Sequence, residues 1–205
     1  AFEDYSTLDN LSGGRLELLI GKGNGAAQAE LFHVTTTDQW DRNREGYELF
    51  RLLWESENVT WSGRFRPPLV NAKTLPRPLQ GRIRIWHGSA TSKDSVDLAA
   101  RHGDPIFSAN VSNPIEPYAE LVRHYRQRWE FYGHQTEDAL VGAGTAGFYV
   151  TRTSQEAVAT YRPMFEARLA FARRAGIPAV FESIDDFVER SSALVGSPEQ
   201  VVDKV

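Results

Sequence analysis

The stretch RIRIWHGSATSKDSVDLAARHGDPIFSA, residues 82–109, decides the fold class of this 205-residue chain. Basic and apolar residues alternate over 82–87, which is the two-residue period of a β-strand. Helical spacing follows over 93–102, and Gly103 is the residue type that most often ends a helix. A short buried strand is expected at 106–109. A strand, a helix and a second strand in this order predict two parallel strands joined by a right-handed crossover.

The same alternation of short apolar runs and longer helical patterns extends on both sides of this unit. The further elements expected are a helix at 3–11, a strand at 16–20, a helix at 38–56, a helix after Pro114, a glycine-broken strand at 139–150, a helix at 154–175 kinked or divided at Pro163, and a helix from 197. Segment 25–36 is expected to be irregular. Prolines exclude a helix from the excursion at 57–81. Strands separated by helices predict an α/β protein, either a doubly wound sheet or a (β/α)8 barrel of which four strands are visible.

Composition excludes several classes of protein. The chain is 41% apolar and 24% charged, which is typical of a globular protein and not of disorder. Its 23 basic and 27 acidic side chains give a net charge of −4, which argues against a nucleic-acid partner. The lack of cysteine excludes disulfides, thiolate metal sites and a cysteine nucleophile. No apolar run approaches the ~20 residues of a membrane span. The acidic, aromatic start is not that of a signal peptide, so we expect a cytoplasmic protein with no membrane partner.

Two loops at carboxyl ends of expected strands could bind a ligand, because that edge is where parallel α/β folds bind ligands. The first loop is GKGNG, residues 21–25, whose glycines expose backbone N–H groups beside the charge of Lys22. It is either an anion or cofactor loop or an ordinary tight turn with a surface lysine.

The second loop is GSATS, residues 88–92, which leads directly into the helix at 93–102. A helix N-terminus offers unpaired N–H donors and partial positive charge, which attract phosphate. Thr91, Ser92 and Ser95 add hydroxyl groups. The alternative is that these hydroxyls only cap the helix.

A third glycine-rich stretch, GAGTAG at 142–147, has the glycine spacing of a dinucleotide fingerprint. That fingerprint must open a helix at once, whereas a β-type pattern continues here through 148–150. The glycines instead favour a strand that lets a ring approach closely. The five histidines show no metal-ligand spacing with carboxylates, so no metal site is expected. His87 either lines the second loop or packs in the core, and no catalytic residue can be assigned.

In combination these motifs resemble the bacterial luciferase-like flavin-dependent monooxygenases and their relatives that use the deazaflavin F420. The motifs that carry the resemblance are TLDNLSGGRLEL at 7–18, GKGN at 21–24, LLW at 52–54, VTWSGRF at 59–65, RPLQ at 77–80, IWHGS at 85–89, AARHGD at 99–104 and GSPEQV at 196–201. They occur in the order and spacing of the family across almost the whole chain.

The resemblance implies a (β/α)8 TIM barrel represented incompletely, with the strands of this chain as about the fourth to seventh. It implies a single luciferase-like domain over residues 1–205. The first three strands of the family and the part after its late helix start have no counterpart here.

The resemblance also implies which residues bind the cofactor. Lys22 matches the basic residue that reaches the flavin phosphate, and Asn24 lines the flavin or its ribityl chain. The phosphate-holding turn matches Gly88, Ser89, Ala90, Thr91, Ser92 and Ser95.

The function that follows is a flavin-dependent oxidoreductase, a monooxygenase that uses reduced FMN and O2 on a small organic substrate. Its expected partners are a separate NAD(P)H-dependent flavin reductase and a second copy of the chain in a homodimer. The alternatives are an F420-dependent oxidoreductase that transfers hydride and a non-catalytic flavin-binding protein of shortened barrel type.

Overall fold

The computed structural model describes residues 1–21, 23, 26–35, 37–109 and 113–205. The chain divides into two compact units, Ala1–His87 and Gly88–Val205, each of which is described by itself.

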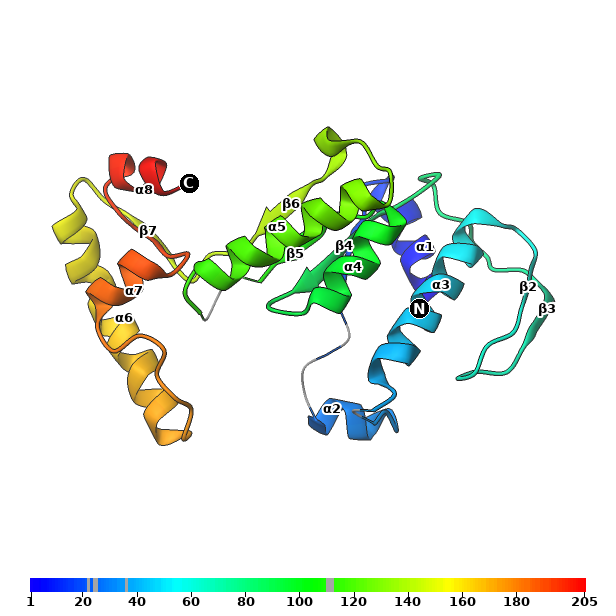
Figure 1. Cartoon of the computed structure of the whole chain (residues 1–205), viewed down its shortest axis with the longest axis horizontal. Coiled ribbons are helices and arrows are strands. Elements are labelled where there is room, and N and C mark those ends of the chain that lie inside the picture. Colours follow the sequence, from blue (N-terminus) through cyan, green and yellow to red (C-terminus); the bar gives the residue numbers. More distant parts are fainter. Residues whose placement is uncertain (22, 24–25, 36, 110–112) are drawn as a thin grey trace. The chain divides into compact units, whose positions relative to one another are not determined.

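Unit 1 combines two parallel strands with helices and a hairpin (Figure 1). Its elements are α1 (Phe2–Ser12), β1 (Glu17–Ile20), α2 (Ala26–Leu31), α3 (Gln39–Glu55), β2 (Val59–Trp61), β3 (Leu69–Ala72) and the start of β4 (Arg84–Ser89). β1 and β4 are parallel, in a register that sets Glu17 opposite Arg84 and Ile20 opposite His87. The parallel pairing predicted from the sequence is confirmed, and Gly13 ends α1 with a φ of 68°.

The core of unit 1 forms where α1 and α3 bring aromatic rings together. The ring of Phe2 lies 5.4 Å from Phe50 and 5.7 Å from Trp54, both in edge-on geometry. The indole Nε1 of Trp54 donates to the carbonyl oxygen of Gly81, 2.8 Å away. This bond ties α3 to the segment that leads into β4.

The excursion at 57–81 contains no helix, as its prolines predict, and β2 and β3 pair there as an antiparallel hairpin. Arg77 anchors the end of the excursion, because its guanidinium donates to the carbonyl oxygens of Leu53 and Trp54 at the C-terminus of α3. The expectation that 25–36 is irregular is wrong for α2, a single short helix whose alanines favour the helical backbone.

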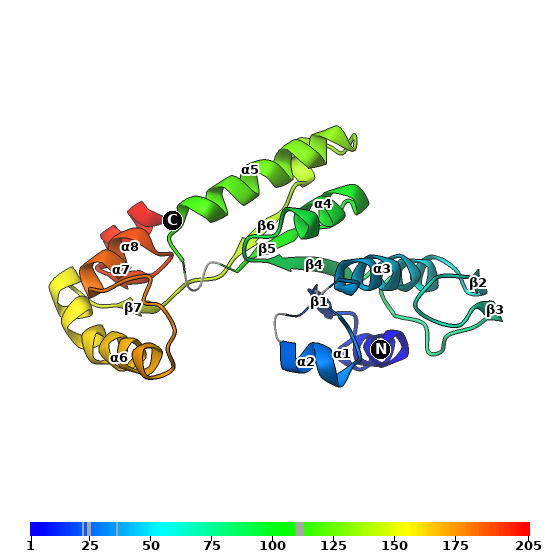
Figure 2. The same ribbon diagram turned by 60° about the horizontal axis from the view of Figure 1, so that its bottom comes forward.

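The first half of unit 2 repeats the strand and helix order. α4 (Lys93–His102) leads to β5 (Ile106–Ser108), and α5 (Glu116–Phe131) leads through a 3-10 turn at Thr136–Asp138 to β6 (Val141–Ala143). β5 and β6 are parallel. Figures 1 and 2 both show α4 and α5 side by side. Their shared core consists of Val96, Ala99, Ala100, Ile106, Leu121, Tyr125 and Trp129.

The second half of unit 2 contains β7 (Phe148–Val150), α6 (Ser154–Arg174), α7 (Ile184–Arg190), β8 (Leu194–Gly196) and α8 (Pro198–Lys204) (Figure 2). β7 and β8 form a parallel pair of their own. The core of this half consists of Ala157, Tyr161, Phe165, Phe181, Ile184, Phe187, Val188, Ala193 and Val195.

Unit 2 differs from the sequence predictions in three places. The single strand expected at 139–150 is two strands in different sheets, because the glycine-rich segment between β6 and β7 interrupts the pairing. β8 was not foreseen, since a run of three residues is too short to show a period. α6 is not divided at Pro163, because the helix continues through that residue. The proline lacks an N–H to donate, but the buried face of Ala157, Tyr161 and Phe165 is intact.

Candidate functional site

The turn between β4 and α4 is built by serines. Ser89 ends β4, and Ser92 is the N-cap of α4, where its Oγ accepts a hydrogen bond from the backbone N–H of Ser95 at 3.4 Å. This is the capping role that the sequence offered as the alternative for these hydroxyls.

Two further hydroxyls hold the shape of the same turn. Ser89 Oγ donates to the carbonyl oxygen of Ser92 and accepts from its N–H, both at 3.1 Å. Ser95 Oγ donates to the carbonyl oxygen of Gly88 at 3.5 Å, and the side chains of Ser89 and Ser95 are both buried. The carbonyl oxygen of Ser89 accepts from the N–H of Ala109, which fixes the turn to the segment after β5. Hydrogen bonds within the turn, together with the bond from Ala109, therefore hold its shape.

The outer side of the turn presents donors to solvent. Ala90, Thr91, Lys93 and Asp94 are exposed. The first N–H groups of a helix have no carbonyl partner within it, and the helix dipole adds partial positive charge at that end. Ala90 is small enough to let a ligand approach the backbone, and Thr91 adds a hydroxyl. Lys93 and Asp94 carry opposite charges, so the partial positive charge of the helix N-terminus is the remaining electrostatic feature of this side of the turn.

The structure brings together six of the eight predicted cofactor residues in one turn: Gly88, Ser89, Ala90, Thr91, Ser92 and Ser95. Within it, Ser89, Ser92 and Ser95 maintain the backbone while Thr91 faces outward. Lys22 and Asn24 lie outside the described residues. The role of all eight in cofactor binding stays a prediction.

His87 packs in the core. Its side chain is 2% exposed, and its ring meets the ring of Tyr47 from α3 edge-on at 4.7 Å. Side chains alternate between the two faces of a strand, so Trp86 and His87 point to opposite sides of β4. Of the two roles weighed for His87, the geometry supports packing.

The glycine-rich stretch at 142–147 does not open a helix, because β7 follows it and α6 begins only at Ser154. The ring that approaches its backbone is that of Tyr161. A Cβ added to Gly147 would lie 2.2 Å from the Tyr161 hydroxyl oxygen. Close packing against α6 therefore explains the glycine at 147. A dinucleotide-binding fingerprint would need a helix directly after the glycines, and no helix begins there.

One polar cluster was not predicted from the sequence. Glu17 of β1 accepts from the indole Nε1 of Trp86 at 2.7 Å and from the guanidinium of Arg84 at 3.0 Å. The three residues share the face of the β1–β4 pair opposite to His87. Alternation along β4 puts Arg84 and Trp86 on one face, but only the register of β1 against β4 reveals Glu17 as their partner.

The described residues contain neither a candidate metal site nor a helix that could span a membrane. Within 1–21, 23, 26–35, 37–109 and 113–205, no group of three or more His, Asp or Glu side chains could hold a metal ion. Over the same part of the chain, every helix is too short or too polar to cross a membrane.

Solved structures share this fold. The monooxygenase RslO1 from Streptomyces bottropensis is 28% identical over 99% of this chain, with a TM-score of 0.78. The oxygenating constituent of 3,6-diketocamphane monooxygenase from Pseudomonas putida, solved in complex with FMN, is 19% identical over the whole chain, with a TM-score of 0.74. The F420-dependent tetrahydromethanopterin reductase from Methanopyrus kandleri is 19% identical over 99% of the chain, with a TM-score of 0.73.

The match covers only part of those proteins. The chain corresponds to 60% of RslO1, 63% of the diketocamphane enzyme and 67% of the reductase. It therefore matches part of a luciferase-like (β/α)8 barrel, as the sequence predicts. The family described as luciferase-like monooxygenase matches by sequence over residues 1–205, the full extent of the chain. The chain belongs to the luciferase-like monooxygenase family.

Proposed function

We propose that this chain holds the phosphate of a flavin cofactor and functions in a monooxygenase that uses reduced FMN and O2 on a small organic substrate. The observation that carries the proposal is the preformed turn at 88–95, which exposes the N-terminus of α4 directly after the carboxyl end of β4. Ligands of parallel α/β folds bind at that end of the strands. Membership of the family supports the redox chemistry.

The residues of the turn fit a phosphate group. Backbone N–H groups at the start of α4 and the hydroxyl of Thr91 supply donors, and the small side chain of Ala90 leaves room for the phosphate oxygens. The family resemblance assigns a positive charge near the phosphate to Lys22 and a contact with the flavin or its ribityl chain to Asn24, and both residues lie outside the described part of the chain. When bound, reduced FMN supplies the electrons that activate O2. A separate NAD(P)H-dependent flavin reductase would supply the reduced FMN.

The structural comparisons also support F420 as an alternative to FMN. The F420-dependent reductase from Methanopyrus kandleri shares the fold as closely as the FMN protein does. A phosphorylated deazaflavin would meet the same donors in the turn at 88–95. The choice between oxygen chemistry and hydride transfer therefore rests on the cofactor.

Comparing FMN with riboflavin tests the phosphate site, because the two differ only in the phosphate. We expect the wild-type protein to bind FMN at least about tenfold more tightly, which corresponds to ~1.4 kcal/mol. Thr91→Asp places a carboxylate at the turn and should reduce that preference while leaving riboflavin affinity unchanged. Thr136→Asp, at another exposed threonine, is the matched control.

Equal loss of FMN and riboflavin affinity in Thr91→Asp would show that the phosphate is held elsewhere. The choice of cofactor is then tested by mixing the protein with FMN, with F420, and with NADPH, O2 and a flavin reductase. A flavin that binds without any turnover would favour the non-catalytic alternative.

A further inference from the structure

The β1–β4 pair of unit 1 has a covered face and an open face. Ile85 and His87 are buried on the covered face, where the ring of Tyr47 from α3 meets His87. Side chains alternate along a strand, so Leu19 and Trp86 lie on the open face, and the parallel register makes them neighbours. Leu19 is 61% exposed and Trp86 is partly exposed. The two side chains therefore form an apolar surface on the open face.

The indole of Trp86 is held in place by Glu17 of β1. Its Nε1 donates to one carboxylate oxygen of Glu17 at 2.7 Å, and the guanidinium of Arg84 donates to the other at 3.0 Å. The charges of Glu17 and Arg84 thus pair with each other. A ring that is fixed through its N–H edge can still offer its flat face to a ligand.

Trp86 precedes the phosphate turn on the same strand. Gly88, the first residue of that turn, is two positions further along β4 and lies on the same face as Trp86. A strand rises about 3.3 Å per residue, so the two positions are about 7 Å apart. The ribityl chain between the phosphate and the ring system of FMN can span that distance. A phosphate held at 88–95 therefore brings the ring system within reach of Trp86.

We propose that the isoalloxazine ring of the flavin stacks on the indole of Trp86, and that Glu17 is the positioning residue that fixes this indole. The inference rests on the proposed function, because the phosphate turn anchors the other end of the cofactor. Flat rings stack on one another with an offset, and Leu19 extends the apolar surface beside the indole. The alternative is that Trp86 only fills the interior of the barrel, in which case its replacement would change stability but not the bound flavin.

The fluorescence of the bound flavin tests this contact with the full chain. An indole in van der Waals contact quenches an excited flavin, because it donates an electron to the ring and then takes it back. The flavin is excited in the visible range, where none of the five tryptophans absorbs. Trp86→Phe should raise the emission of bound FMN and of bound riboflavin several-fold. Trp61→Phe, at another partly exposed tryptophan of unit 1, is the matched control and should leave the emission unchanged.

Affinities separate the ring contact from the phosphate contact. Trp86→Ala should weaken the binding of FMN and of riboflavin by the same factor, about fivefold to tenfold, because both ligands carry the ring. The ratio of the two affinities should therefore stay at its wild-type value. Thr91→Asp should instead change that ratio.

Two substitutions test the positioning role of Glu17. Glu17→Gln and Glu17→Met both remove the charge that pairs with Arg84, but only the glutamine keeps an oxygen that can accept the indole N–H. The emission of the bound flavin should rise in Glu17→Met and stay near its wild-type value in Glu17→Gln. Circular dichroism and the thermal midpoint show whether each variant is folded, and Glu17→Met provides the test if Trp86→Phe does not fold.

The ring contact is overturned if folded Trp86→Phe binds flavin with wild-type emission, or if Trp86→Ala leaves both affinities unchanged. Wild-type emission in Glu17→Met would overturn the positioning role of Glu17. A wild-type protein that binds neither FMN nor riboflavin would overturn the proposed function as well. A preference for FMN that Thr91→Asp reduces, together with unchanged emission in Trp86→Phe, would overturn the ring contact alone.

Discussion

Asp9 and Gln80, 71 positions apart in the sequence, form two hydrogen bonds with each other. The backbone N–H of Gln80 donates to one carboxylate oxygen of Asp9 at 2.9 Å, and its side-chain amide donates to the other at 2.7 Å. The same amide nitrogen donates to the carbonyl oxygen of Leu16 at 2.9 Å. Asp9 is fully shielded from solvent, so this pair ties α1 to the segment before β4 and to the start of β1.

Asp9→Asn should destabilise unit 1 in a pH-dependent way. Burial raises the pKa of Asp9, but the hydrogen bonds around its carboxylate, chiefly those from Gln80, together lower it more, so the pKa lies below 3.8. A lowered folded-state pKa means that the stabilisation is complete above the unfolded value and is lost as the pH falls through the folded one. At neutral pH we expect a loss of about 1–3 kcal/mol in the free energy of unfolding.

Urea titrations of both proteins, at about pH 7 and about pH 3, measure this effect. The difference between wild type and Asp9→Asn should shrink at the lower pH. A difference that is the same at both pH values would show that the ionised carboxylate is not the stabilising species.

Arg77→Ala should destabilise the end of α3. The two terminal nitrogens of Arg77 donate to the carbonyl oxygens of Leu53 and Trp54, which have no partner within the helix. We expect a loss of roughly 1.5–3 kcal/mol, the range for a hydrogen bond to a charged group, measured by urea denaturation. Arg77→Lys is the matched variant, and it should recover less than half, because an ammonium lacks the planar fork. Full recovery in Arg77→Lys would mean that charge alone matters.

Tyr125→Phe should change stability most at moderate pH. The Tyr125 hydroxyl is buried and donates to the carbonyl oxygen of Asp104 at 3.0 Å. Burial raises the pKa of Tyr125 well above 10.0, and the charge of Asp104 raises it further. A raised pKa gives stabilisation that is complete below the unfolded value and is lost as the pH rises above it.

Thermal midpoints at about pH 8 and about pH 11 test this assignment. Wild type should be more stable than Tyr125→Phe by about 0.5–1.5 kcal/mol at the lower pH and should lose that advantage at the higher one. An advantage that persists at the higher pH would contradict the prediction.

Gly147→Ala should destabilise unit 2, because the new methyl group would collide with the Tyr161 hydroxyl. Overpacking of this kind costs roughly 1–3 kcal/mol. Tyr161→Phe removes the colliding oxygen, so the double variant should lose less than the sum of the two single losses. Chemical denaturation of all four proteins forms the double-mutant cycle. Strict additivity would show that Gly147 and Tyr161 do not meet.

The sequence predicts the parts of this fold that have a local signal. Gly13 and Gly103 mark helix ends, and the alternation at 82–87 marks β4, so α1, α4 and β4 were predicted close to their observed bounds. β8 was missed because three residues show no period, and β7 was merged with β6 because glycines hide the break between them.

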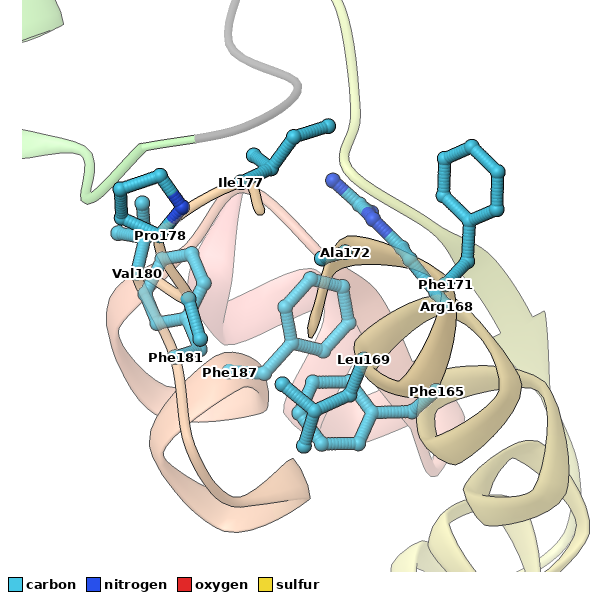
Figure 3. Close-up of a pocket in the computed structure, with 11 residues that line it drawn as sticks. Phe165, Arg168, Leu169, Phe171, Ala172, Ile177, Pro178, Val180, Phe181 and Phe187 are labelled. Atoms are coloured by element: carbon cyan, nitrogen blue, oxygen red, sulfur yellow. The ribbon is translucent and has the colours of Figure 1, made fainter. Parts of the chain in front are cut away.

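The candidate site is likewise predicted only in part from the sequence. The sequence predicts that residues 88–95 form a turn and a helix start, because serine, threonine and glycine have known roles there. The sequence does not show which hydroxyls form hydrogen bonds within the turn, because Ser89 and Ser95 become buried only when β4 and α4 pack. The packing of Phe165 against Phe187 is also not predicted, because the two rings lie on different helices and meet only in the folded chain (Figure 3).

The hydrogen bonds among Ser89, Ser92 and Ser95 have a kinetic consequence. Because these side chains hydrogen-bond within the turn, the backbone amides at the start of α4 are already oriented without a ligand. Binding of the proposed phosphate would then require no folding of the turn and would lose little conformational entropy. The association rate of the proposed phosphate should be governed by diffusion and ionic strength, and competing phosphorylated ligands should differ mainly in their dissociation rates.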